Sequence, residues 1–154
     1  MEKHSGVELI IRTAHESELG YIAELEKISF PDPWSEKSLT ETFAQNHALI
    51  LTGWLDGELA GYVTFYHVLD EGEIARIAVE PSLRRLGTAT QLMDGLEKYC
   101  AQNNISKIML DVRESNLPAI SFYKKCGFLE DGIRKKFYEN PEESAVLMSK
   151  ELGK

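Results

Sequence analysis

The sequence predicts an α/β domain with a mixed central β-sheet of about seven strands, flanked by about four helices. Apolar segments with the period of a strand alternate along the chain with segments that have the period of a helix. The pair Asp56-Gly57 lies between two apolar runs and predicts a β-hairpin. The length of 154 residues suits a single domain, residues 1–154, around one core. The expected order of elements is βααβββαβαββ.

The first half of the chain is expected to form a strand, two helices and the hairpin. The first helix is predicted from apolar residues along one side, namely Leu19, Ile22, Leu25 and Ile28. Phe30-Pro31-Asp32-Pro33 then interrupts the chain, because proline disfavours a helical conformation at the residue before it. Ser35 is a suitable N-cap for the second helix. In order, we expect strand 7–13, helix 17–29, helix 35–45, and hairpin strands 47–55 and 58–68.

The second half is expected to alternate strands with helices before a final pair of strands. The segment 73–80 is nearly continuously apolar, which predicts a central position in the sheet. Asn116 suits an N-cap, and Gly127 suits the end of the helix that follows it. In order, we expect strand 73–80, helix 87–101, strand 107–113, a helix after Asn116, and strands 128–137 and 144–151.

Composition excludes several classes of function. The formal net charge of −8 argues against direct binding to nucleic acid and is compatible with a basic protein or peptide as partner. No apolar run approaches the roughly 18 residues of a membrane span. The N-terminal segment has no apolar stretch followed by a small-residue cleavage site, so we expect no signal peptide. We therefore expect a cytoplasmic monomer that makes no membrane contact. The four histidines are scattered and no Cys/His pair has ligand spacing, so we expect no metal site.

The loop between the predicted strand 73–80 and the helix 87–101 has features of a phosphate site. Helix N-termini expose unpaired N–H groups and a positive partial charge, which suits an anion. Gly87 and the small Ala89 would let the backbone approach a ligand. Arg84 and Arg85 would add charge-assisted donors for a pyrophosphate. The alternative is a solvated basic loop that opens an ordinary helix, because short glycine motifs match by chance.

Two side chains in the next strand and helix are candidates for proton transfer. Asp111 lies inside an apolar strand, where loss of solvation raises a carboxyl pKa and makes the carboxylate a better proton acceptor. Tyr123 lies on the inward helical face, and a phenol with a pKa of about 10 suits protonation of a departing thiolate. The alternatives are that Asp111 pairs structurally with Arg113 or Arg76, and that Tyr123 is a core tyrosine.

These segments resemble a known family. Arg84-x-x-Gly87-x-Ala89, after a Val-x-Pro strand end, resembles the acyl-CoA pyrophosphate motif of the GNAT superfamily of N-acetyltransferases. Leu-Asp-Val-Arg-x-Ser-Asn from Leu110, followed by Ala-x-x-x-Tyr-x-x-x-Gly-Phe from Ala119, is similar to the RimI branch. The segments Phe30–Lys37 and Phe137-Tyr138 resemble two loops of that branch, so the matches cover nearly the whole chain.

The resemblance implies a GNAT fold and the use of acetyl-CoA as acetyl donor. Enzymes of the RimI branch acetylate the N-terminal alanine of a small-subunit ribosomal protein, so the resemblance implies an N-terminal α-amine as the acceptor. It places Asp111 at the position of the general base and Tyr123 at that of the general acid. Trp34 and Tyr138 would line the entrance for the acceptor N-terminus. The contacts to acetyl-CoA would come from the backbone of Ile77, Ala78 and Val79, and from Arg84, Arg85, Gly87, Thr88, Ala89, Thr90 and Asn116.

The sequence departs from the family pattern at two positions. Leu86, just before Gly87, is often basic in the family. The base of the branch is normally glutamate, and Asp111 is one methylene shorter, so a water would bridge the gap to the amine. Glu73, at the start of the predicted central strand, is a second candidate for the base, although its simpler role is a solvated strand end.

The implied reaction is direct attack of a neutral α-amine on the acetyl thioester, without a covalent intermediate on the enzyme. An α-amine has a pKa of about 7.7 to 8.0, so roughly a tenth is neutral at pH 7, which favours an N-terminal acceptor over a lysine side chain. Two other functions stay open. One is acetylation of a small amine or polyamine, and the other is a non-catalytic, acyl-CoA-binding regulatory module.

Overall fold

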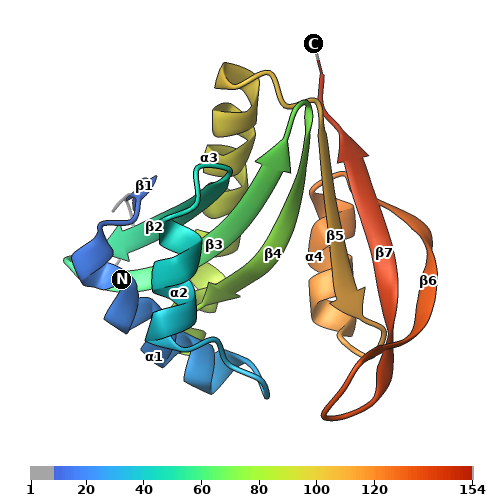
Figure 1. The fold of residues 1–154 in the computed structure, drawn as a ribbon, viewed down its shortest axis with the longest axis horizontal. Helices are drawn as coiled ribbons and strands as arrows, with labels where there is room; N and C mark the ends of the chain where they lie inside the picture. Colours follow the sequence, from blue (N-terminus) through green and yellow to red (C-terminus); the bar gives the residue numbers. More distant parts are fainter. Residues whose placement is uncertain (1–8, 154) are drawn as a thin grey trace.

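A seven-stranded mixed sheet lies at the centre of the computed structural model, which describes residues 9–153 apart from the side chain of Arg85 (Figure 1). The strands are β1 Ile10–Thr13, β2 Ala48–Leu55, β3 Glu58–Val68, β4 Glu71–Val79, β5 Lys107–Arg113, β6 Leu129–Tyr138 and β7 Glu143–Glu151. The helices are α1 Leu19–Ser29, α2 Glu36–Phe43, α3 Thr88–Gln102 and α4 Leu117–Lys125, with 3-10 turns η1 Glu16–Glu18 and η2 Pro81–Leu86. The predicted fold class and order of elements are confirmed, and Val7 and Glu8 of the predicted first strand lie outside the described residues.

The sheet opens between β4 and β5. Its strand order is β1-β2-β3-β4-β5-β7-β6, and β4 and β5 form its parallel pair. They are paired over Glu71–Ile74 and Lys107–Leu110, and beyond that point they separate toward their carboxyl ends, as Figure 1 shows. On the other edge of β4, Ala75 is an extra residue opposite the step from Thr64 to Phe65 of β3. This β-bulge bends β4 where the separation begins.

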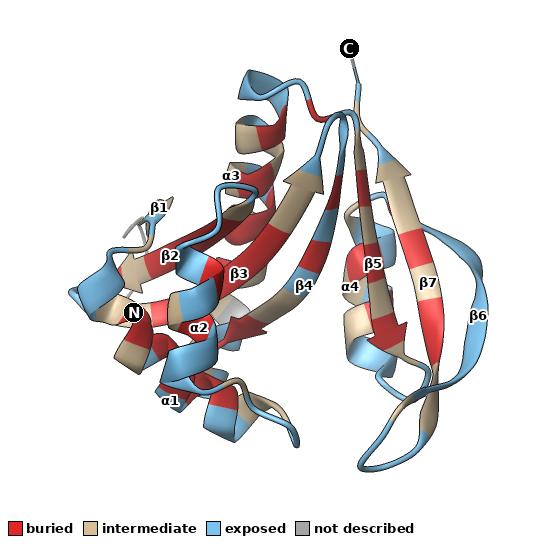
Figure 2. Ribbon diagram, in the orientation of Figure 1, coloured by how far each residue is buried: buried red, intermediate tan, exposed pale blue. Residues whose placement is uncertain are grey.

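Helices cover both faces of the sheet. α3 and α4 pack on one face, in a core that includes Leu92, Leu96 and Ile120. α1 and α2 pack on the other face, where Leu19 and Leu39 contact buried residues of the first strands. Figure 2 shows the buried residues concentrated in the sheet and on the inward sides of the helices, whereas β6 is exposed along most of its length.

Local signals in the sequence account for the connections. Asp56 and Gly57 have positive φ angles of 52° and 82°, the conformation that a two-residue type I′ hairpin requires. The Ser35 side chain accepts a hydrogen bond of 3.1 Å from the backbone N–H of Ser38, and so caps α2 as predicted. Among the helices of the described residues, none is long and apolar enough to span a membrane.

One prediction about α1 is wrong. Ile28 was expected on the apolar side of the helix, yet 61% of its surface is exposed. A helical turn takes about 3.6 residues, so residues spaced by three drift around the helix. Ile28 therefore points about 180° away from the direction of Leu19, on the opposite side of α1. Glu26 points within about 20° of the direction of Leu19. Glu26 therefore faces inward and is fully buried.

This correction predicts different costs for two truncations in the same helix. Leu25→Ala should lower the free energy of unfolding by about 2–5 kcal/mol, because Leu25 is buried in the core beneath α1. Ile28→Ala should change it by less than about 0.5 kcal/mol, because the side chain already faces water. Urea denaturation followed by circular dichroism measures both. Equal losses in the two variants would contradict the assigned orientation of α1.

Candidate active site

Two carboxylates and a tyrosine meet where β4 and β5 separate. Asp111 follows Leu110, the last residue of β5 that pairs with β4. Its Oδ1 accepts a hydrogen bond of 2.9 Å from the hydroxyl of Tyr138 at the end of β6. Glu73 of β4 lies close enough to interact with the Asp111 carboxyl directly, by charge and by hydrogen bonding. A substrate that entered the gap between the strands would meet this group of acidic oxygens.

Glu73 is more than the solvated strand end that the sequence suggested. It lies inside β4, two residues after the strand begins, and pairs with Met109 of β5. Partial burial raises the pKa of its carboxyl, the charge of Asp111 and a hydrogen bond with it raise the pKa further, and Arg134 opposes them. The residue as a whole remains exposed, so its carboxyl can exchange protons with water. Glu73 is therefore a stronger candidate for proton acceptance than its sequence position indicated.

The suggested pairing of Asp111 with a neighbouring arginine is wrong. Arg113 lies 3.3 Å from Glu143, and its guanidinium carbon lies 4.4 Å from the centre of the Tyr138 ring. Arg76 is on the face of the sheet covered by α1, where it pairs with Glu26. Since both arginines have other partners, the hydrogen bond that fixes the Asp111 side chain comes from Tyr138.

Tyr123 is a buried residue of α4 whose hydroxyl is influenced by the charge of Asp111. Only 6% of its surface is exposed, and its ring packs edge-on against Phe128 at 5.7 Å. Burial raises the pKa of its hydroxyl well above the usual range, and the charges of Cys126 and Asp111 act in the same direction. The phenol therefore stays protonated at neutral pH and is available as a donor. The core packing that the sequence allowed as an alternative coexists with this position near Asp111.

The start of α3 has the geometry of a phosphate site. Gly87, its N-cap, has a left-handed φ of 77°, and no neighbouring atom lies within 4 Å of the position that a β-carbon would take. No side chain caps the helix, so its first N–H groups, including those of Thr88, Ala89 and Thr90, have no side-chain acceptor. Arg84 is exposed beside them, whereas the side chain of Arg85 lies outside the described residues. These features fit a pyrophosphate.

One edge of β4 has no strand partner beyond the separation. Ile77, Ala78 and Val79 pair with β3 on one side, but the ladder with β5 has ended at Ile74. Backbone groups on the free edge are available to the amides of an extended ligand. Asn116 caps α4 with its carbonyl oxygen, which accepts from the N–H of Ala119 at 3.3 Å. The residue as a whole is exposed.

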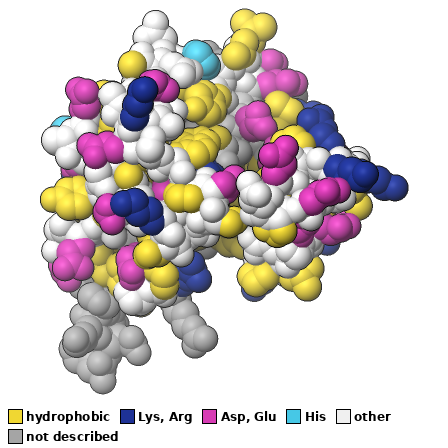
Figure 3. Space-filling model, turned by 60° about the horizontal axis from the view of Figure 1, so that its bottom comes forward, with side chains coloured by type: hydrophobic (Ala, Val, Ile, Leu, Met, Phe, Trp, Pro, Cys, Tyr) yellow, Lys and Arg dark blue, Asp and Glu magenta, His cyan; other side chains and the backbone are white. Residues whose placement is uncertain are grey.

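Two loops frame the open end of the sheet. Trp34 lies between α1 and α2 and is partly buried against the core beneath them. Tyr138 follows a large irregularity of β6, in which residues 135–137 lie between the partners of Ala145 and Glu143. Both loops lie at the end where β4 and β5 separate (Figure 1). Figure 3 looks toward this end and shows a hollow with apolar side chains in it and acidic side chains around it.

Sequence reasoning missed a buried polar network behind the Trp34 loop. Glu26 accepts hydrogen bonds from the Tyr62 hydroxyl and from the backbone N–H of Trp34, the latter at 2.7 Å. Arg76 completes the network, 3.4 Å from the Glu26 carboxylate. The available signal was the position of Glu26, seven residues after Leu19 and thus on the apolar side of the helix.

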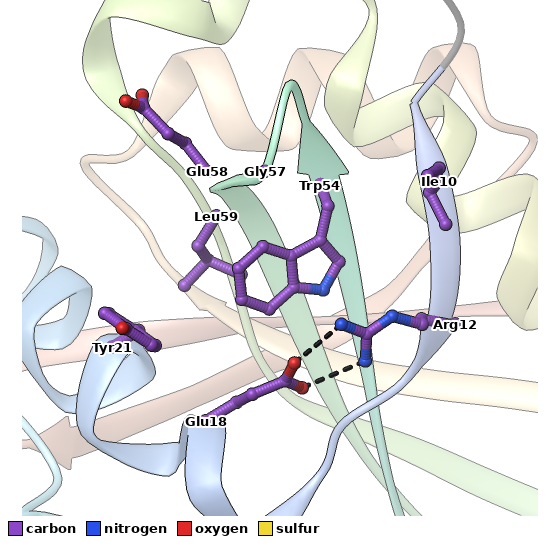
Figure 4. Close-up of a pocket in the computed structure, with 8 residues that line it drawn as sticks. All are labelled: Ile10, Arg12, Glu18, Tyr21, Trp54, Gly57, Glu58 and Leu59. Carbon is purple, nitrogen blue, oxygen red and sulfur yellow. Dashed lines mark hydrogen bonds and ion pairs between the residues drawn. The ribbon is translucent and has the colours of Figure 1, made fainter.

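A cavity of about 470 Å³ lies apart from these carboxylates, at the β1 edge of the sheet (Figure 4). Two of its lining residues bind each other, because both Arg12 Nη atoms donate to the Glu18 carboxylate, at 3.0 and 2.6 Å. Trp54 covers the same guanidinium at 5.0 Å. Glu73, Asp111 and Tyr123 are not among the residues that line this cavity. In the described part of the chain, no cluster of His, Cys, Asp and Glu could hold a metal ion.

Comparisons with known proteins agree with this geometry. A profile of the acetyltransferase (GNAT) family matches residues 19–128. A protein of Bacillus subtilis (strain 168), assigned as a [ribosomal protein bS18]-alanine N-acetyltransferase, is 32% identical over 90% of this chain and 92% of its own. The [ribosomal protein bS18]-alanine N-acetyltransferase of Escherichia coli (strain K12) is 34% identical over 76% of this chain and 80% of its own.

The fold also matches a solved structure of the same branch. The crystal structure of the ribosomal-protein-S18-alanine N-acetyltransferase from Escherichia coli superposes with a TM-score of 0.87, at 27% identity and 95% coverage of both chains. The expected GNAT fold and the resemblance to the RimI branch are thereby confirmed. The chain belongs to the GNAT family and is an acetyl-CoA-dependent N-acetyltransferase.

Proposed function

We propose that this enzyme transfers the acetyl group of acetyl-CoA to the N-terminal α-amine of a ribosomal protein that begins with alanine. The observation that carries the proposal is the pair of carboxylates, Glu73 and Asp111, at the point where β4 leaves β5. The acceptor is inferred from the bS18-alanine N-acetyltransferases that the chain resembles. A net charge of −8 suits a basic acceptor, and we propose a cytoplasmic monomer that binds neither nucleic acid nor membrane.

The donor is proposed to lie along the free edge of β4. The N–H groups at the start of α3 would hold its pyrophosphate, with Gly87 giving close approach and Arg84 and Arg85 adding charge. The backbone of Ile77, Ala78 and Val79 would pair with its amides, and Asn116 would add a side-chain contact. Bound acetyl-CoA supplies an activated acetyl thioester. A strand N–H directed at its carbonyl oxygen would stabilise the oxyanion that forms during attack.

The carboxylates are proposed to remove the proton from the acceptor. As the amine nitrogen bonds to the acetyl carbon, its surplus proton passes to Asp111, directly or through a water, with Glu73 beside it. Partial burial and the charge of the adjacent Asp111 both make the Glu73 carboxyl hold a proton more readily. The hydrogen bond from Tyr138 keeps the Asp111 oxygen in place during this transfer.

Tyr123 is proposed as the acid. When the bond between carbon and sulfur breaks, the leaving thiolate takes the phenolic proton, which restores a neutral thiol. The raised pKa of the buried hydroxyl ensures that it carries this proton at neutral pH. Trp34 and the ring of Tyr138 line the two sides of the acceptor entrance in this proposal, so the peptide reaches the thioester between the two loops.

The first test is acetyl-CoA turnover, measured by thiol release, on short basic peptides that differ in their first residue. We expect rapid turnover on a peptide with a free N-terminal alanine, and none on its acetylated copy or on a copy whose only amine is a lysine side chain. An α-amine is far more often neutral at pH 7 than a lysine, so the modest base suffices. Turnover confined to small amines or polyamines would replace the proposed acceptor.

Removing the base should separate chemistry from binding. Asp111→Asn is expected to lower kcat on the alanine peptide by about 10²- to 10⁴-fold, because the amide cannot accept the proton. The KM for acetyl-CoA should stay within about twofold of wild type, since the phosphate site is elsewhere. Asp131→Asn, on the exposed strand β6, is the matched control and should leave both constants unchanged. Full turnover by Asp111→Asn would remove Asp111 from the mechanism.

The raised pKa of Glu73 predicts a pH-dependent stability difference. Above the ordinary glutamate pKa of about 4.3, the unfolded chain releases this proton more readily than the folded chain, so wild type loses stability as pH rises through the raised pKa. Glu73→Gln has no such proton and should have the higher melting temperature at pH 7, with the difference vanishing below about pH 4. Glu71→Gln, exposed on the same strand, should melt like wild type at both pH values. A lower melting temperature for Glu73→Gln at pH 7 would contradict the assignment.

A further inference from the structure

The loop that carries Trp34 is wrapped around a single guanidinium. The Arg76 Cζ atom lies 4.2 Å from the centre of the Phe30 ring and 4.8 Å from that of Trp34. Its Nη2 donates to the backbone oxygen of Asp32 at 2.6 Å, and its Nη1 lies 3.6 Å from the Asp32 carboxylate. Phe30, Asp32 and Trp34, which are every second residue along the loop, thus all contact the Arg76 side chain. Planar stacking together with forked donors is a combination that arginine provides and lysine does not.

Glu26 fixes the other side of the guanidinium. The carboxylate is fully buried at the end of α1, where an unpaired charge would be unfavourable. It binds Arg76 at 3.4 Å and accepts the Trp34 backbone N–H at 2.7 Å. The hydroxyl of Tyr62, from β3, is its third partner. Both the side chain and the backbone of Trp34 are therefore held by the same buried pair.

The network leaves two buried polar groups without a hydrogen-bond partner. Among the described residues, the Arg76 Nε–H is buried without a hydrogen-bond partner, and Thr64, which pairs with Arg76 across the ladder, has an unpartnered hydroxyl. Buried ion pairs are often no more stabilising than apolar residues of similar size. Positioning of the Trp34 loop explains the network better than a contribution to stability. The network would set the distance between this loop and the carboxylates, because Arg76 and Glu73 lie on the same strand, on either side of the bulge at Ala75.

We propose that Arg76 is a positioning residue that holds the Trp34 loop in the conformation that admits the acceptor peptide. The inference rests on the proposed function, in which Trp34 lines the acceptor entrance. The side-chain partners of Arg76 lie on α1 and in the loop, and neither Gly87 nor Asp111 is among them. Loosening the loop should weaken binding of the peptide and leave donor binding and the chemical step intact.

The test is Arg76→Lys, which keeps a positive charge beside the buried Glu26 but lacks the planar fork. We expect the KM for the alanine peptide to rise about tenfold or more, with kcat and the KM for acetyl-CoA within about twofold of wild type. Arg12→Lys is the control, because Arg12 also stacks on a tryptophan and pairs with a glutamate, but at the β1 edge. It should leave all three constants unchanged. The double variant Arg76→Met with Glu26→Gln removes both charges together and should reproduce the effect of Arg76→Lys without burying an unpaired charge.

A readout independent of turnover comes from the two tryptophans of the chain. In a Trp54→Phe background, fluorescence reports on Trp34 alone, and Arg76→Lys should make it more accessible to quenching by acrylamide. If wild type acetylates no peptide, the proposed function fails, while the quenching result still decides whether Arg76 holds the loop. Unchanged quenching, or a fall in kcat as large as the rise in peptide KM, would overturn the inference.

Discussion

Parallel pairing between β4 and β5 ends after four residues, and the rest of the site depends on where it ends. The bulge at Ala75 turns β4 away from its neighbour just beyond the last pair, Ile74 and Leu110. Unpaired backbone groups are costly when buried, but here they lie along an edge that no strand covers, where the proposed function places acetyl-CoA. A continuous ladder would have closed this free edge.

The two faces of the sheet carry different parts of the candidate site. The start of α3 and the Tyr123 side chain belong to the face covered by α3 and α4. Asp111 alternates with the core residues Leu110 and Val112 of β5, and so points to the opposite face. In the proposed function, the donor phosphate and the acceptor amine therefore approach from opposite sides of the sheet. An acid and a base would then act on one thioester without competing for the same space.

Charged side chains near the proposed acceptor entrance lie at two depths. Nearer the solvent, partial burial and the charge of Asp111 raise the pKa of the Glu73 carboxyl. Deeper in the structure, Glu26 and Arg76 neutralise each other and are enclosed by aromatic rings. Paired charges of this kind give little net stability, yet they constrain geometry because both directions and distances must be satisfied. In the proposed mechanism the carboxylates accept a proton, and in the proposed positioning role the buried pair fixes the shape of the loop.

The sequence by itself determined the order of elements, the hairpin at Asp56-Gly57, the helix cap at Ser35 and the glycine that opens α3, because these depend on local conformational preferences. It also identified Asp111 and Tyr123 as candidates, since polar groups on apolar faces are visible in the pattern. The exposed position of Ile28 follows from helical rotation and was missed, as was the inward position of Glu26. Only the tertiary structure decided which charges are partners: Asp111 with Tyr138 and Glu73, and Arg76 with Glu26. These partners are 27, 38 and 50 residues apart, and their contact depends on strand register and on the bulge, which no local preference specifies.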